Sequence, residues 1–161
     1  MKNEESVGCV MIYEHVADEQ GDSLKRNEED LFLLMQSRRG DWNFVKGHRE
    51  YRESDEETLR REVYEETGIR NFKILGFVGK IRYKFSDKAG HKIKKEVIFY
   101  LASSDTREVT LSSEHINFKW TGYKDAIGVL SFDQSISILN RAVKIKKALS
   151  ASRATTATTI D

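Results

Sequence analysis

The pattern of apolar and polar positions predicts strands in the first and middle parts of the chain. Apolar runs bounded by polar turns indicate buried strands, and period-two alternation indicates strands with one buried face. These patterns predict strands at residues 7–13, 31–35, 42–44, 77–85, 96–102 and 117–120. In the segment 77–85 the residues predicted to share one face are Phe77, Gly79, Ile81, Tyr83 and Phe85. The turn residues 86–91 predict an antiparallel hairpin with 96–102, and the charged segment 15–30 predicts a loop.

Three helices are predicted between and after these strands. Ser54 followed by Glu57 is a capping-box pattern, and Gly68 supplies a left-handed residue at which a helix ends. Within this helix Leu59 and Val63 are expected to face inward. A short helix is predicted at 123–130 and a longer one at 132–149. The inner stripe of the longer helix is predicted to contain Phe132, Ile136, Leu139 and Val143.

The order of these elements predicts an α/β fold in which a mixed sheet lies between helices. We expect a single domain over residues 1–149. Residues 150–161 have low complexity and few large apolar side chains, so a flexible C-terminal tail is expected there.

Composition narrows the class of protein. The chain has 161 residues, 39% of them hydrophobic and 33% charged, which is typical of a soluble globular domain. A net charge of +1 argues against an extended nucleic-acid surface. The single cysteine, Cys9, lies in an apolar run and is expected to be a buried thiol. With no leader-like or membrane-length apolar segment, a cytoplasmic location is expected. The oligomeric state stays open between monomer and homodimer.

The central helix carries more negative charge than an isolated helix tolerates. Glu62, Glu65 and Glu66 stand at i, i+3 and i+4, so they share one face, where like charges repel. Residues 53–66 contain seven acids and two bases, a local net charge of −5. Carboxylates without His or Cys nearby suit Mg²⁺ or Mn²⁺ rather than zinc. The alternative is a solvated charged helix, which explains neither the like charges nor the flanking glycines.

The same residues resemble the signature of the Nudix pyrophosphohydrolases. That pattern is Gly, five residues, Glu, seven residues, Arg-Glu, an apolar residue, any residue, Glu-Glu, any residue, Gly, apolar. All nine places are matched here, by Gly47, Glu53, Arg61, Glu62, Val63, Glu65, Glu66, Gly68 and Ile69. The resemblance implies an α/β/α sandwich with a loop-helix-loop catalytic segment, and metal-dependent hydrolysis of a nucleoside diphosphate linked to another group.

The resemblance also implies roles for these residues. Metal ligands would be Glu62, Glu65, Glu66 and the carbonyl of Gly47, where glycine lets the backbone approach the ion. Arg61 would orient the glutamates by ion pairing, with Glu53 as its partner. When bound, the ion neutralises the diphosphate and activates the attacking water.

Flanking segments resemble the asymmetrical diadenosine tetraphosphate hydrolase branch of that family. These segments are Trp-Asn-Phe-Val-Lys-Gly-His at 42–48, in which Val45 replaces the usual proline, the strand 95–101, and Leu-Ser-Ser-Glu-His at 111–115. Lys46 and Lys95 match the branch and are favoured over Lys80 and Lys94 as phosphate ligands.

The remaining candidates are weighed against ordinary structural roles. Tyr83 is a candidate for stacking on adenine, with core packing an equal alternative. Glu114 is a candidate for the base outside the helix or a further metal ligand, and this role is favoured slightly over that of a solvent-exposed loop carboxylate. His48 and His115 are candidates for contacting phosphate or for packing at loop edges, whereas Trp42 and Trp120 are more typical of core residues.

Three hypotheses for function follow. The first is Mg²⁺-dependent hydrolysis of diadenosine tetraphosphate to ATP and AMP. The second keeps the chemistry but acts on diphosphoinositol polyphosphates, 5′-triphosphate RNA ends or oxidised nucleoside triphosphates. It is motivated by the basic residues Lys80, Arg82, Lys84, Lys88, Lys92, Lys94 and Lys95. The third is a catalytically silent nucleotide-binding module, which is disfavoured because no signature residue is lost.

Overall fold

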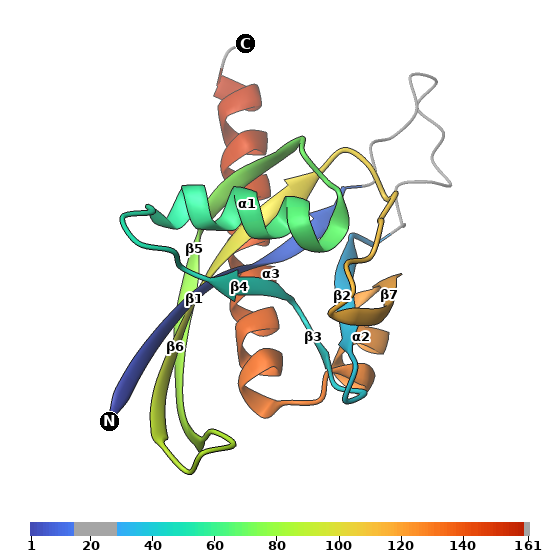
Figure 1. The fold of residues 1–161 in the computed structure, drawn as a ribbon. Coiled ribbons are helices and arrows are strands. Elements are labelled where there is room, and N and C mark those ends of the chain that lie inside the picture. Colours follow the sequence, from blue (N-terminus) through green and yellow to red (C-terminus); the bar gives the residue numbers. More distant parts are fainter. Residues whose placement is uncertain (15–28, 160–161) are drawn as a thin grey trace.

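Among the described residues, a seven-stranded mixed sheet forms the centre of the protein (Figure 1). The computed structural model describes residues 1–14 and 29–159, with 153–159 as helical backbone only. The strands are β1 (Lys2–Tyr13), β2 (Leu31–Ser37), β3 (Trp42–Asn43), β4 (Val45–His48), β5 (Phe72–Ser86), β6 (Lys92–Ser104) and β7 (His115–Thr121). The helices are α1 (Asp55–Thr67), α2 (Tyr123–Val129) and α3 (Asp133–Thr159). The predicted α/β class is confirmed, whereas most of the predicted loop 15–30 lies outside the described residues.

β1 is the strand around which the sheet is built. The strand order is β3-β2-β1-β6-β5, with β4 also paired to β1 and β7 to β2. β1 and β6 run parallel, from Lys2 opposite Ile93 to Tyr13 opposite Ser104, and the other pairs are antiparallel. β4 pairs with the middle of β1, so the chain that leads into α1 begins beside the centre of the sheet.

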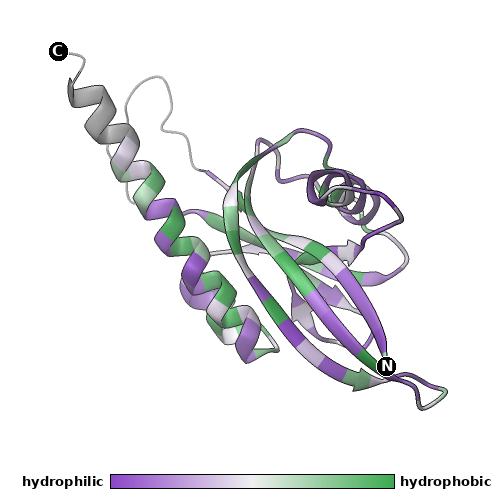
Figure 2. Cartoon of the chain, turned by 90° about the vertical axis from the view of Figure 1, so that its left-hand side faces the viewer, coloured by the Kyte–Doolittle hydropathy of each residue, from purple (hydrophilic) through white to green (hydrophobic). Residues whose placement is uncertain are grey.

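Helices cover both faces of the sheet, as predicted. α1 lies on one face and α3 on the other, and Figure 2 shows α1 end-on across the sheet from α3. On the α1 side the fully buried Leu59 and Val63 pack with Cys9, so the predictions for these three residues are confirmed. On the α3 side Ile138 and Leu139 belong to a second core. Figure 2 colours α1 almost wholly hydrophilic, because most of its side chains face away from that core.

The ends of α1 form as the sequence predicts. The Ser54 hydroxyl accepts a hydrogen bond from the Glu57 amide at 3.1 Å, and the Glu57 carboxylate accepts one from the Ser54 amide at 3.3 Å. At the other end Gly68 adopts φ 76° and donates its amide to the Tyr64 carbonyl at 2.8 Å. These caps hold the first and last turns, so the acidic face has a defined start and end.

The predicted face of β5 is wrong at Phe77. The β5–β6 register shifts between Phe77 and Gly79, and this bulge places Val78, 7% exposed, in the core on the α3 side. Phe77 is 51% exposed and packs edge-on against Tyr100, whose ring lies against the α1-side core. An extra residue reverses the alternation, so Phe77 leaves the face that Gly79 occupies.

The predicted last helix begins within one residue of the observed start, but its predicted end and the predicted burial of Phe132 are wrong. α3 continues to Thr159 rather than ending at 149, because residues 150–159 contain no glycine or proline and include several alanines. Phe132 precedes the helix and is 45% exposed instead of lying on its inner stripe. Among the described residues, no helix combines the length and apolar character needed to cross a membrane.

Candidate active site

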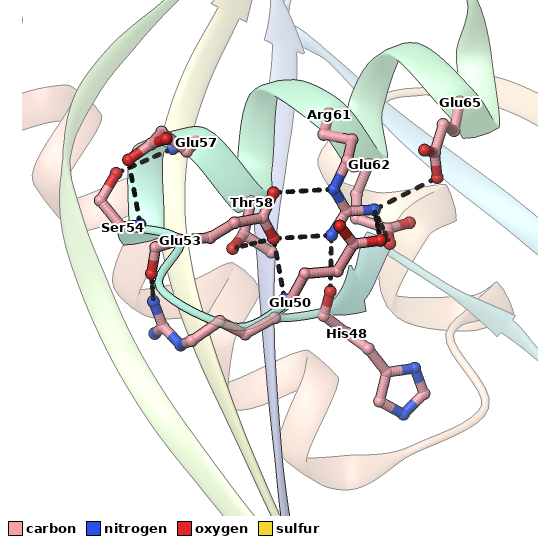
Figure 3. Close-up of polar contacts among 10 residues, drawn as sticks. His48, Glu50, Glu53, Ser54, Glu57, Thr58, Arg61, Glu62 and Glu65 are labelled. Carbon is pink, nitrogen blue, oxygen red and sulfur yellow. Dashed lines mark hydrogen bonds and ion pairs between the residues drawn. The ribbon is translucent and has the colours of Figure 1, made fainter.

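Arg61 lies at the centre of the site and donates hydrogen bonds to several of its groups (Figure 3). Its Nε and Nη2 atoms donate to the two carboxylate oxygens of Glu53 at 2.8 and 2.9 Å, a bidentate pair. Nη1 donates to Glu62 at 2.8 Å and to Glu65 at 3.3 Å, and Nη2 also reaches the backbone carbonyl of His48 at 2.8 Å. One guanidinium therefore joins the strand end, the loop and the acidic face of α1. The predicted pairing of Arg61 with Glu53 and the glutamates is present.

Glu53 is fixed as an anion by this pair. Arg61 is the main reason that the pKa of the Glu53 carboxyl falls to about 2, and further hydrogen bonds come from the Glu50 amide and Thr58 hydroxyl. Reciprocally, Glu53 raises the pKa of Arg61. The pair thus stays charged at neutral pH and can hold the glutamates by geometry.

The loop before α1 is anchored by a second set of polar contacts. Arg49 bonds to both Glu5 and Asp55, and Asp55 accepts a 2.5 Å hydrogen bond from the Tyr100 hydroxyl. Burial, followed by Asp55, raises the pKa of Tyr100 to about 12. Within the loop Arg52 has φ 65°, the single positive φ of a non-glycine residue among the described residues. The loop is held at its ends while one residue is in a strained conformation.

Gly47 makes room for the carboxylate of Glu62. A Cβ atom added to Gly47 would lie 1.8 Å from Glu62 Cδ and 2.0 Å from Oε2. Glu62 is only 9% exposed, and burial raises the pKa of its carboxyl despite the neighbouring Arg61. Repulsion from Glu65 and Glu66 acts in the same direction. The carboxylate is therefore pressed against bare backbone at β4, which is where a carbonyl oxygen can join it around a cation.

Glu66 connects α1 to the segment before β7. Its Oε2 accepts a 2.5 Å hydrogen bond from the Ser112 hydroxyl and lies 2.7 Å from His115 Nδ1. Glu114 stands beside it, and the charge of Glu66 is the main reason that the pKa of Glu114 is raised. The predicted Glu114 and His115 are thus brought to the acidic face from a segment about 50 residues away.

The donor set fits a hard divalent cation. The available donors are the carboxylates of Glu62, Glu65 and Glu66 on α1 and the backbone of Gly47, where any Cβ would meet the Glu62 carboxylate. Within the described ranges no three acidic, His or Cys side chains are close enough to enclose an ion as they stand. Instead, Glu62 and Glu65 accept hydrogen bonds from Arg61, while Glu66 contacts Ser112 and His115.

Two lysines predicted to bind phosphate lie next to each other on the α3 side. Burial, and then the charge of Lys95, lowers the pKa of Lys46 to about 8. Lys95 is 6% exposed, and Glu62 is among the charges that act on it. Lys46 Nζ lies 3.4 Å from the Tyr83 hydroxyl and 5.7 Å from its ring centroid. The cations therefore stand between the carboxylates and Tyr83.

A cavity of about 720 Å³ opens next to Tyr83. Its aromatic lining comprises Tyr83, Phe85 and Phe132, and its polar lining comprises Arg39, Asn43, Lys46, Ser86, Asp87, Lys88, Gln134 and Ser135. Tyr83 is 36% exposed, so of the two alternatives for its role the structure favours an accessible ring over core packing. The cavity combines flat apolar faces with amide, hydroxyl and cationic groups, as a nucleotide site requires.

The prediction of site residues from sequence missed Phe132 and Ser112. Helical periodicity assigned Phe132 to the inner stripe of the last helix, so its position in the cavity was not predicted. Ser112 belongs to a segment that drew attention for Glu114 and His115, and its hydroxyl bond to Glu66 needs the folded chain. The backbone and the side chain of His48 make separate contacts. Its carbonyl faces Arg61 while its imidazole points away (Figure 3) and meets Glu4 at 3.3 Å.

Parts of this chain are similar in sequence to known proteins. The model of the NUDIX domain family matches residues 22–138. The asymmetrical bis(5′-nucleosyl)-tetraphosphatase of Rattus norvegicus is 34% identical over 110 residues, which is 64% of this chain and 71% of that protein.

Solved structures share the fold. A binary complex of a C. elegans Ap4A hydrolase has a TM-score of 0.70 at 24% identity, covering 90% of this chain and 98% of that one. The E. coli dihydroneopterin triphosphate pyrophosphohydrolase has a TM-score of 0.64 at 15% identity, covering 88% and 97%. The same architecture therefore occurs in proteins named for different substrates, so the substrate of this chain depends on the side chains around its cavity.

Proposed function

Because this chain belongs to the Nudix family of hydrolases, which act on phosphoric anhydride bonds, we propose that its substrate is diadenosine tetraphosphate, cut to ATP and AMP. The family match identifies the chain as a Nudix pyrophosphohydrolase of nucleotide polyphosphates. The choice of diadenosine tetraphosphate rests on the lining of the cavity beside Tyr83. The rat relative, named for this activity, supports it.

The main support for this substrate is an aromatic cavity that two lysines connect to the acidic helix. Tyr83 and Phe132 both line the cavity and are both partly exposed, so they offer faces on which a purine can stack. Lys46 and Lys95 stand between this cavity and Glu62. A nucleoside bound in the cavity would direct its phosphate chain across the two ammonium groups toward the carboxylates.

The residues of the acidic face would then divide the chemistry among them. Nudix hydrolases generally need a divalent metal such as Mg²⁺, which Glu62, Glu65, Glu66 and the Gly47 carbonyl would hold here. When bound, the ion supplies positive charge for the diphosphate and activation of the attacking water. Arg61, fixed by Glu53, keeps Glu62 and Glu65 in register.

Glu114 is proposed to accept the proton of the attacking water, since it stands beside Glu66 and outside α1. A phosphorus–oxygen bond to water forms as the anhydride bond to the leaving phosphate breaks. His48 and His115 are the remaining phosphate candidates. The contact of His115 with Glu66 favours a positioning role for that side chain.

A substrate panel tests the proposal. Diadenosine tetraphosphate, a diphosphoinositol polyphosphate, 5′-triphosphate RNA and an oxidised nucleoside triphosphate are compared by kcat/KM with Mg²⁺, and products are identified by chromatography. We expect diadenosine tetraphosphate to rank first, with equal amounts of ATP and AMP, and Glu65→Gln to lose this activity. A higher rank for any other substrate overturns the assignment.

The aromatic cavity is tested separately by Phe132→Ala. Loss of one stacking face is worth about 1–3 kcal/mol, so KM for the nucleotide should rise by about 5- to 150-fold while kcat changes less. Phe77→Ala is the matched control, because Phe77 is similarly exposed but does not line the cavity. Equal effects of the two substitutions would count against nucleotide binding in the cavity.

The second candidate is the same chemistry on a diphosphoinositol polyphosphate. The hairpin of β5 and β6 presents the exposed lysines Lys84, Lys88, Lys92 and Lys94, a density of charge that suits a highly phosphorylated ring. An inositol ring has no flat aromatic face that could stack on Phe85 or Phe132, so a nucleotide is preferred as the substrate.

A further inference from the structure

A carboxylate of this chain lies against Lys95 and His48, two side chains that a phosphate would meet on its way to α1. Glu4 lies on β1 directly opposite Lys95 of β6 in the parallel register. Its Oε2 atom is 3.3 Å from His48 Nε2 and 3.6 Å from Lys95 Nζ. One oxygen thus lies close to two side-chain nitrogens, as an oxygen of a bound anion would.

This anion site is connected to the proposed substrate path. Lys95 is opposite Tyr83 in the β5–β6 ladder, and its charge acts on Lys46. On the other side Lys95 is within electrostatic reach of Glu62, and His48 follows Gly47 in β4. The Glu4 carboxylate therefore stands between the aromatic cavity and the acidic face of α1.

Glu4 is held there as an anion but is not locked in. Burial opposes its charge, yet His48 and Lys95 together keep the pKa of the Glu4 carboxyl below its ordinary value. The Glu4 side chain is 22% exposed, whereas that of Lys95 is 6% exposed. Rotation of the glutamate toward solvent would therefore uncover a cation that is itself fixed in the protein.

We propose that Glu4 is a built-in competitor for a phosphate site formed by Lys95 and His48, and that it sets how much negative charge a ligand needs to enter. The proposal rests on the proposed function, in which a polyphosphate crosses these cations. A carboxylate carries one negative charge, and each additional phosphate of a ligand adds one or more. Longer polyphosphates therefore displace it more readily than short ones.

Binding of inorganic tripolyphosphate tests the proposal without reference to turnover. Calorimetry with Mg²⁺ should give a Kd about 3- to 10-fold lower for Glu4→Gln than for the unmodified protein. The matched control is Glu5→Gln, which removes the same charge one residue along β1 from a side chain that pairs with Arg49. The control should change Kd less than twofold.

The partner of Glu4 is identified by repeating the substitution in a Lys95→Gln background. In that background Glu4→Gln should lower the Kd by less than twofold, because the phosphate site has lost its main cation, Lys95. An unchanged or higher Kd for Glu4→Gln, or an equal gain in both backgrounds, overturns the proposal. Glu4→Thr gives the same comparison with a β-branched residue if Glu4→Gln does not fold.

Substrate length provides the second measurement. Glu4→Gln should raise kcat/KM for diadenosine triphosphate by a larger factor than for diadenosine tetraphosphate. Equal factors contradict a role in selecting charge. If neither dinucleotide is hydrolysed the proposed function fails, while the tripolyphosphate Kd still decides the role of Glu4.

Discussion

Replacement of Gly47 by alanine isolates the close approach between β4 and α1. The added methyl group would lie 1.8 Å from Glu62 Cδ and 2.0 Å from Oε2, far inside van der Waals contact. Because both atoms are at the end of a flexible side chain, we expect Glu62 to swing away while the backbone stays in place. The carboxylate would then leave the position next to the Gly47 carbonyl.

The cost can be divided between folding and catalysis. Moving Glu62 breaks its 2.8 Å hydrogen bond to Arg61, a charged bond between two largely buried groups that contributes about 2 kcal/mol. For a chain of this length the melting temperature should fall by about 4–8 °C. Misplacing a carboxylate that is proposed to hold the metal should reduce kcat/KM by about 100-fold, equivalent to about 2.7 kcal/mol of transition-state stabilisation.

The assay combines kcat/KM with the Mg²⁺ concentration that gives half-maximal activity, and with Mn²⁺ binding followed by electron paramagnetic resonance. Gly47→Ala should need about 10- to 100-fold more metal in both measurements. Gly76→Ala is the control, since an added Cβ there meets no atom within 4 Å. Unchanged metal affinity with most of the activity retained would refute the reasoning. A fall in melting temperature beyond about 15 °C would show that the backbone moves instead.

Two further predictions concern the segment around Arg61. Glu53, whose pKa is lowered to about 2, stabilises the fold fully above its unfolded pKa of 4.5, and this stabilisation disappears as pH falls toward 2. The melting temperature of Glu53→Gln should therefore lie below that of the unmodified protein at pH 7 and approach it between pH 4.5 and 2; a constant difference would contradict the ion pair. Arg52→Gly should raise stability by about 0.5–1 kcal/mol in chemical denaturation, because glycine adopts φ 65° without strain. Arg52→Ala, which also removes the stacking on Tyr51, should give no such gain.

The features that sequence predicted well depend on neighbours along the chain. The caps of α1, its acidic face and the pairing of Arg61 with Glu53 all lie within a few helical turns. The caps and the acidic face follow from 3.6 residues per turn, whereas the pairing with Glu53, which precedes the helix, was implied by the resemblance to the Nudix signature. The Nudix signature occupies this same stretch, which is why the chemistry could be predicted before the substrate.

The features that sequence did not predict depend on contacts between distant segments. Nothing local in β5 shows that Val78 starts a bulge, so the face of Phe77 was assigned by simple alternation. Phe132 fits the period of α3 but precedes it, and only the folded chain shows that it lines the cavity. Glu4 meets Lys95 through a parallel pairing, which no spacing in the sequence indicates.

That parallel pairing has a consequence for how the protein is made. The strand β1 finds its longest partner, β6, about 90 residues later in the chain, and β4 pairs with only its middle. During synthesis an apolar strand therefore waits for most of the protein to emerge, exposed to other chains and to chaperones. α1, with its own caps, can form early, but Lys95 arrives with β6 and Ser112 after it. A nascent chain would carry its acidic helix well before it contained Lys95, which is proposed to bind phosphate.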